Sequence, residues 1–98
     1  MFIKIHESYR DIVAICDKEL LGKKFEEGKF QLDAKESFFK GDECSEGKTK
    51  EIISKISAED ATFNIIGEKS VQCALDCNII SEDGIKKIRG IPFALVLL

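Results

Sequence analysis

The chain has 98 residues, is 44% hydrophobic and 34% charged, and carries a formal net charge of −3 at pH 7. This composition excludes intrinsic disorder, and the length suits one domain with a modest core. No apolar run approaches the roughly 18 to 20 residues of a membrane-spanning helix. The N-terminal sequence MFIKIHESYR lacks the pattern of a signal peptide. We therefore expect one cytoplasmic domain over residues 1–98.

The first third of the chain predicts a sheet. Residues 2–5 alternate between two faces, which is typical of a strand. Residues 12–16 form an apolar run between two aspartates and predict a central strand, with residues 6–11 as the hairpin loop. Residues 30–32 alternate with polar neighbours and predict a third, short strand.

The middle of the chain predicts mainly helix. Residues 34–47 begin as a helical turn and continue as a polar, acidic loop. We expect Thr49 to cap a helix through residues 50–56, in which the isoleucines share one face. Residues 62–66 predict a short strand or an extended lead-in to the next helix.

The clearest helix lies in residues 67–80. Its apolar residues are three and four apart, as on one face of a helix, and Glu68 lies in the first turn, where the helix dipole favours an anion. Asn78 suits the left-handed position that follows a helix. Ile79 could then fold back on Leu75.

The chain closes on two strand-like runs, residues 85–88 and 92–98. Pro92 cannot donate a ladder hydrogen bond, so it belongs at a strand start or an edge. The residues after it are apolar on both faces, which predicts a strand covered from both sides. A dimer surface on its exposed face is the alternative. The order of elements predicts an α+β domain, a mostly antiparallel sheet packed with two to three helices.

Three segments, in order and spacing, resemble the archaeal family called domain of unknown function 424: residues 15–28, 64–75 and 88–98. The resemblance covers nearly the whole chain and implies a small, single-domain archaeal protein of α+β form, without an assigned reaction. Members of the family commonly have a histidine where this chain has Phe93, which argues against a catalytic imidazole there. They tend to have glycine at the position of Asn78, which supports a helix end at this point.

Cysteine spacing offers a weak metal signal. Cys73 and Cys77 lie one helical turn apart, but two thiolates are half of a tetrahedral zinc site. Cys16, Cys44 or His6 would have to converge on them. Cys16 is better explained as a small core residue. We expect no metal and no cofactor, and thiols rather than disulfides in a reducing cytosol. The Lys- and Ile-rich composition, shared by hyperthermophiles and AT-rich genomes, leaves a cysteine pair open.

The sequence contains no assembled catalytic motif. His6 is the sole imidazole and has no nucleophile and orienting group at a recognisable spacing, so a solvated loop histidine is the simpler interpretation. Acidic neighbours of Cys44 disfavour a reactive thiolate. The run GEKS, residues 67–70, lacks the earlier glycine of a phosphate-binding loop.

Basic residues give the binding hypothesis. Lysines in the turn at residues 23–24 and basic residues at 86–89 form one patch if the two turns lie on the same side of the sheet. Ordinary solvated lysines are the alternative. Amides at the start of the helix at residue 68 offer a second anion site, although capping alone explains them. The candidate binding residues are Lys23, Lys24, Gly67, Glu68, Lys69, Lys86, Lys87 and Arg89.

Three functional hypotheses follow. We favour a non-catalytic binding or accessory protein, with RNA or the ribosome as candidate partner and no membrane partner. The second is an enzyme whose site forms at a dimer interface. The third is a structural homo-oligomer, because the terminal strand is so apolar.

Overall fold

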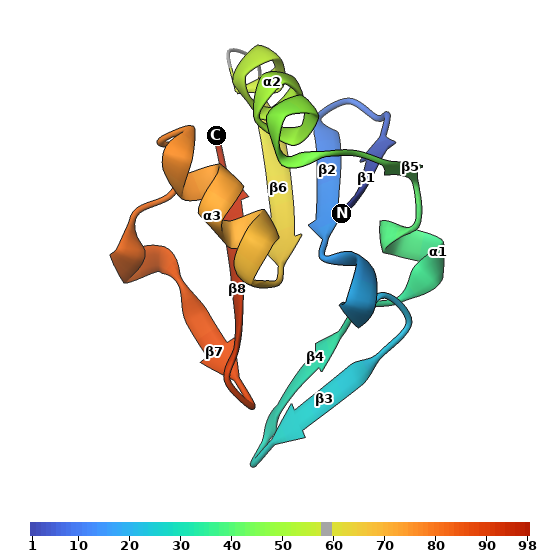
Figure 1. Cartoon of the computed structure of the whole chain (residues 1–98), viewed down its shortest axis with the longest axis vertical. Helices are drawn as coiled ribbons and strands as arrows, with labels where there is room; N and C mark the ends of the chain where they lie inside the picture. The colour runs from blue at the N-terminus through green and yellow to red at the C-terminus, as the bar shows by residue number, and fades with distance from the viewer. Residues whose placement is uncertain (58–59) are drawn as a thin grey trace.

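The computed structural model describes residues 1–57 and 60–98. The described residues form a six-stranded sheet with the order β5-β1-β2-β6-β8-β7 (Figure 1). Neighbouring strands are antiparallel except β2 and β6, which are parallel. The strands are β1 Phe2–His6, β2 Asp11–Cys16, β5 Asp42–Glu43, β6 Ala61–Ile66, β7 Lys86–Ile88 and β8 Ile91–Leu97.

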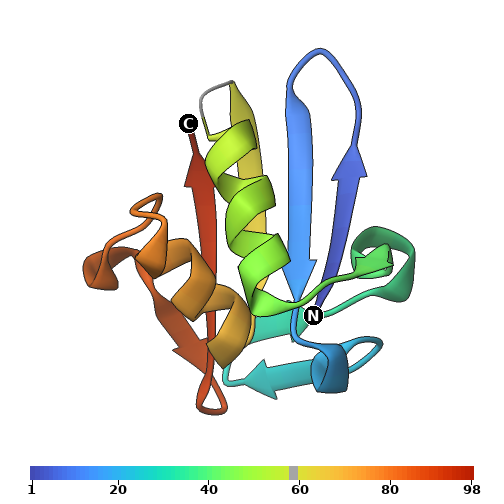
Figure 2. The same ribbon diagram turned by 45° about the horizontal axis from the view of Figure 1, so that its top comes forward.

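Two helices, α2 (Glu46–Ile56) and α3 (Glu68–Asp76), cover one face of this sheet (Figure 2). The main core lies between them and the strands, around Val13, Ile53 and Phe63, which are fully buried. None of the helices described is long and apolar enough to cross a membrane.

A second, smaller layer covers part of the opposite face. It consists of the hairpin of β3 (Lys24–Glu27) and β4 (Phe30–Asp33) and of the short helix α1 (Glu36–Phe39). Since side chains alternate along a strand, Cys16 and Ile66 point to this face and pack in a second cluster with Leu32, Phe39 and their neighbours. Two single-turn 3₁₀ helices, η1 (Lys18–Leu20) and η2 (Glu82–Gly84), complete the structure.

The α+β class and the mostly antiparallel sheet are confirmed. The first hairpin and the strand around residues 30–33 are present as expected, and residues 61–66 form a strand, which was one of the two alternatives for this segment. Asn78 adopts a φ of 60°, the left-handed conformation expected just past α3. The parallel pairing of β2 with β6 was not expected. A long connection separates these two strands in the sequence, and after such a connection a strand can pair in either direction.

Two local predictions are wrong. Helix α2 begins at Glu46, and its cap is Ser45, whose hydroxyl accepts a hydrogen bond of 3.2 Å from the amide of Lys48. Thr49 is instead buried, and its hydroxyl donates to the Ser45 carbonyl at 2.8 Å. The preceding acidic segment is also not all loop, because β5 pairs with the start of β1. Strand β3 was not expected at all.

The terminal strand β8 lies inside the sheet, between β6 and β7. Ala94 is 5% exposed, while Leu95 and Leu97 are 64% and 71% exposed. The expectation of a strand covered from both sides is therefore wrong for its last part. Helices cover the face of Ala94 and Val96, whereas the smaller layer on the other face reaches only as far as Phe93.

Candidate functional site

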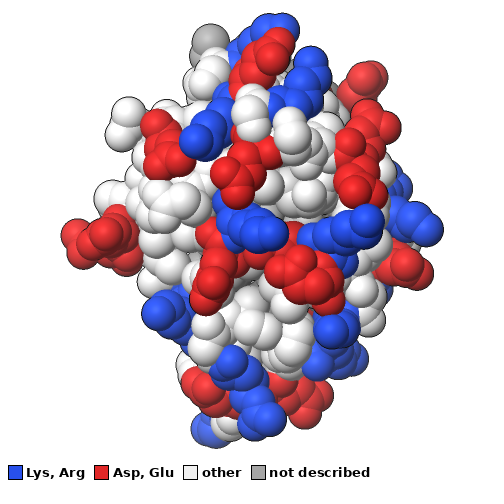
Figure 3. Space-filling view, viewed as in Figure 1, with Lys and Arg blue, Asp and Glu red and all other residues white. Residues whose placement is uncertain are grey.

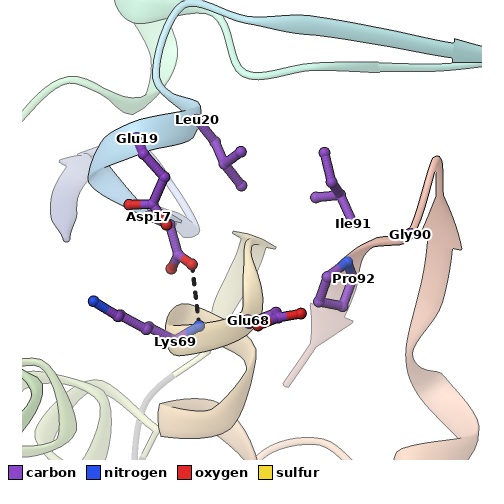
Figure 4. A pocket seen from close by; sticks show the side chains of 8 residues that line it. All are labelled: Asp17, Glu19, Leu20, Glu68, Lys69, Gly90, Ile91 and Pro92. Atoms are coloured by element: carbon purple, nitrogen blue, oxygen red, sulfur yellow. Dashed lines mark hydrogen bonds between the residues drawn. The ribbon is translucent and has the colours of Figure 1, made fainter.

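The carboxyl ends of the two parallel strands, β2 and β6, lie next to each other at one end of the sheet. Asp17 follows β2, and its amide donates to the carbonyl of Ile66, the last residue of β6. The Asp17 side chain is 2% exposed and accepts hydrogen bonds from the amides of Lys69 (3.1 Å) and Ser70 (2.8 Å). The Ser70 hydroxyl donates a third, at 2.6 Å. Asp17, the residue after β2, is thus the cap of α3 although it is distant from this helix in the sequence (Figure 4).

The Asp17 carboxylate already accepts hydrogen bonds from the amides of Lys69 and Ser70, which were proposed from the sequence as a binding site for an external anion. Gly67 has a φ of 110°, and a Cβ there would overlap the Asp17 carboxylate, so the backbone and the carboxylate are in direct contact. Glu68 and Lys69 are exposed beside this contact. An anion at the start of α3 would have to compete with an internal carboxylate.

A cavity of about 170 Å³ opens in front of the cap, between η1, the start of α3 and the β7–β8 turn. Figure 4 shows Glu19 and Leu20 on one side and Ile91 and Pro92 on the other. Its lining residues are Asp17, Glu19, Leu20, Glu68, Lys69, Gly90, Ile91 and Pro92. Two of the three candidate residues at the helix start, Glu68 and Lys69, therefore line the same cavity as Gly90, the neighbour of Arg89 in the β7–β8 turn.

The β3–β4 and β7–β8 hairpins contact each other at the lower end of the molecule in Figure 1. Arg89 and Gly90 form the two-residue turn of the second hairpin, with φ values of 55° and 78°, as a tight hairpin of this twist requires. The Arg89 amide donates to Glu27 Oε1 at 3.0 Å. This bond links the turn of one hairpin to the end of β3 in the other.

Two cavities lie where the hairpins meet. Lys24 and Arg89, which are 65 positions apart in the chain, line the first, of about 380 Å³, with Phe25 and Glu26. Lys86 and Lys87 line the second, of about 230 Å³; its lining residues are Glu27, Phe30, Lys86, Lys87, Ile88 and Phe93. Lys23 precedes β3 and lines neither cavity. We call residues 23–30 and 86–90 the hairpin surface.

The hairpin surface is locally basic. Its two segments hold six lysine or arginine residues and two glutamates, in a protein whose net charge is −3. The basic side chains proposed from the sequence are exposed, and none of them forms an ion pair with a described residue: Lys23, Lys24, Lys86, Lys87 and Arg89. In Figure 3, Lys and Arg side chains gather at this end, next to a few acidic ones.

Sequence reasoning missed the aromatic part of this surface. Phe30 is 72% exposed, although its alternation with polar residues suggested an ordinary strand. The available signal was its position directly after the Gly28–Lys29 turn, since residues at a hairpin tip are seldom covered. Burial, however, depends on what packs against β4, which no local pattern records.

The thiols do not converge. Cys73 lies on α3 and Cys77 directly follows this helix; the Cys77 thiol donates to the Lys50 carbonyl of α2 at 3.5 Å. Cys16 points to the opposite face of the sheet. Burial, with the charges of Asp17 and Glu19, raises the pKa of Cys16 to about 12. Burial also raises the pKa of Cys73. The part of the chain that the structure describes contains no group of three or more His, Cys, Asp or Glu placed to hold a metal.

His6 is not a solvated loop residue, which corrects the sequence interpretation. It ends β1 and is half-buried, with its ring stacked on Phe38 at 4.6 Å between ring centres. Its Nε2 lies 2.9 Å from the Phe38 carbonyl, and a carbonyl only accepts, so Nε2 carries the proton and donates. The imidazole thereby links α1 to β1.

Comparison with known proteins identifies the fold and the family. A crystal structure of an uncharacterized conserved protein from Methanopyrus kandleri superimposes with a TM-score of 0.87 at 22% identity, over 98% of this chain and 89% of that one. No curated protein matches the chain. The family described as protein of unknown function (DUF424) matches residues 6–98. Because the match spans nearly the whole sequence, the chain belongs to this family of unknown function.

Proposed function

We propose that this protein is an RNA-binding accessory protein and that the hairpin surface contacts the RNA phosphates. The observation that carries the proposal is the meeting of Lys24 and Arg89 at one cavity, with Lys86 and Lys87 at the next. These cations come from opposite ends of the sequence and form no ion pair with a described residue. A surface with unneutralised cations is available to an external polyanion.

The charge distribution supports a localised contact. The hairpin surface carries a net charge of +4, so the rest of the chain carries −7. Phosphates are attracted to the hairpin end and repelled elsewhere, which orients the ligand and limits non-specific attachment. Each phosphate contact also releases condensed counterions, so the affinity must fall as salt rises.

The turn geometry restricts the backbone of one of these cations, Arg89. The Arg89 amide is held by Glu27, and the two-residue turn leaves few backbone alternatives. A guanidinium that projects from a rigid turn loses less conformational freedom on binding a phosphate than one on a flexible loop.

The test compares wild type with Lys86→Glu/Lys87→Glu for binding to total tRNA and to ribosomal subunits, at low and at physiological salt. The matched control is Lys35→Glu/Lys40→Glu, which makes the same change in net charge at exposed lysines outside the hairpin surface. We expect wild type and control to bind, and the first variant to lose about 10-fold or more in affinity and to show a shallower salt dependence.

Arg89→Asn refines this test because it removes the charge and keeps the turn. Asn-Gly is the favoured pair for a two-residue hairpin turn, so this variant stays folded. We expect weaker binding, with the slope of log affinity against log salt reduced by about one. Negligible binding of all proteins to both RNAs, or an equal loss in the Lys35/Lys40 control, would overturn the proposal.

A further inference from the structure

We propose that the cavity lined by Phe30 and Phe93 takes an unpaired base, so the preferred ligand of the hairpin surface is single-stranded RNA. This inference rests on the proposed function, because it assumes that phosphates lie along the adjacent lysines. It adds a chemical class of ligand, an unstacked base, to a surface that charge alone would describe as a general phosphate binder.

The walls of the cavity differ from its rim. Ile88, 5% exposed, and the half-buried Phe93 provide an apolar wall on the β7–β8 hairpin, while Phe30 reaches the cavity from β4. Lys86 pairs with Phe93 across the ladder and therefore lies on the same face of the hairpin, where it forms the charged edge of the cavity. The cavity, of about 230 Å³, therefore has an apolar interior and a cationic edge.

An aromatic ring as exposed as Phe30 is suited to stacking. Every nucleobase has a flat π face, so aromatic side chains bind single-stranded nucleic acids with little dependence on sequence when cations hold the backbone beside them. Bases within a duplex are already stacked and paired, so they cannot enter such a cavity. The combination of ring and lysines thus selects single strands, whereas lysines alone bind both forms.

The position of Glu27 supports the proposal that a base, and not a phosphate, enters the cavity. Its side chain lines the same cavity, and Oε1 accepts the hydrogen bond from the Arg89 amide. A carboxylate there repels a phosphate but can accept a hydrogen bond from the exocyclic amine of a base. Phosphates are accordingly directed to Lys86 at the edge of the cavity, and the base to its interior.

The experiment measures binding of a non-self-complementary RNA of about 12 nucleotides and of the duplex with its complement, by fluorescence anisotropy at fixed low salt. The proteins are wild type, Phe30→Leu, Phe30→Tyr, and Tyr9→Leu as a control at a fully exposed aromatic outside the hairpin surface. Phe30→Leu keeps an apolar side chain at an exposed position and should therefore fold.

We expect wild type, Tyr9→Leu and Phe30→Tyr to bind the single strand tighter than the duplex. Phe30→Leu should lose about 5-fold or more for the single strand and stay within about 2-fold of wild type for the duplex. Equal binding of both RNAs by wild type, with no effect of Phe30→Leu, would overturn the base site and leave the phosphate-binding proposal intact. Negligible binding of both RNAs by wild type would overturn both.

Discussion

Asp17 and Ser70 are joined by two hydrogen bonds to one carboxylate oxygen, from the Ser70 amide at 2.8 Å and from its hydroxyl at 2.6 Å. They lie 53 residues apart, at the end of β2 and in the first turn of α3. This contact links the start of a helix to a strand that is not its sequence neighbour. It also fills the position that a free anion would take at the helix start, so its first role is structural.

Asp17→Ala should therefore destabilise the fold. The substitution removes the cap of α3 and leaves two backbone amides without their acceptor, at a site that is 2% exposed. We expect a loss of about 2–3 kcal/mol in the free energy of unfolding, measured with urea. Asp17→Asn keeps one carbonyl acceptor and should lose less. A stability of Asp17→Ala equal to that of wild type would show that the cap is dispensable.

Gly67→Ala tests the backbone beneath the same contact. The positive φ of Gly67 disfavours any side chain, and a Cβ would overlap the Asp17 carboxylate, so we expect a loss of about 3 kcal/mol or more, or failure to fold. Gly47→Ala is the control, because Gly47 lies in α2 with open space around its Cβ position. It should gain about 0.5–1 kcal/mol. Equal effects of the two substitutions on the thermal midpoint would contradict this prediction.

The buried thiol of Cys16 predicts a loss of stability at alkaline pH. Its pKa of about 12 in the folded protein lies above the ordinary value of 9.0. Between these values the unfolded chain releases the proton and the folded protein retains it, so stability falls as pH rises above 9.

Urea unfolding of wild type and Cys16→Ala at about pH 7 and about pH 10 isolates this contribution. Cys16→Ala is less stable at neutral pH because it leaves a small cavity, and its deficit should shrink by about 1 kcal/mol at the higher pH. A deficit that stays constant with pH would show that the Cys16 thiol titrates alike in both states.

Deletion of residues 94–98 should unfold the protein. These residues supply the antiparallel partner of β6 and carry the buried Ala94 and half-buried Val96 to the helix-covered core. Their loss removes several kcal/mol from a total stability that is of order 5–15 kcal/mol for a domain. The prediction is wrong if the truncated chain keeps a cooperative thermal transition within a few degrees of wild type.

Leu95→Ser/Leu97→Ser is the matched control for the deletion. It keeps the strand and changes only side chains that are 64% and 71% exposed, so we expect the thermal midpoint to move by a few degrees at most. Light scattering on the same proteins measures their oligomeric state and so tests the hypothesis of a structural homo-oligomer. A wild-type dimer that this double substitution converts to a monomer would support that alternative, and a wild-type monomer would remove it.

Local patterns were sufficient for part of the fold. The alternation at residues 2–5, the apolar run at 12–16 and the helical spacing after Gly67 each depend on neighbours within a few positions, and the structure contains all three elements. Asn78 in the left-handed conformation was predictable for the same reason. The α+β class followed because the order of such elements restricts how they can pack.

Other elements depend on partners that are distant in the chain. Strand β5 has two residues and exists because it pairs with β1, and the direction of the β2–β6 pair depends on the path of the connection between them. The cap of α2 was misassigned because both Ser45 and Thr49 have capping side chains. Tertiary packing buries Thr49, and Ser45 is left at the helix start.

For the candidate site, composition and local pattern were enough to show which residues are basic and that they lie at turns. Three features of the site come instead from the packing of distant segments. Lys24 and Arg89 line one cavity, Phe30 is exposed beside Lys86, and Asp17 occupies the start of α3. The physical reason is that convergence and exposure depend on which surfaces pack together. That packing minimises the free energy of the whole chain, so it cannot be predicted from a short segment alone.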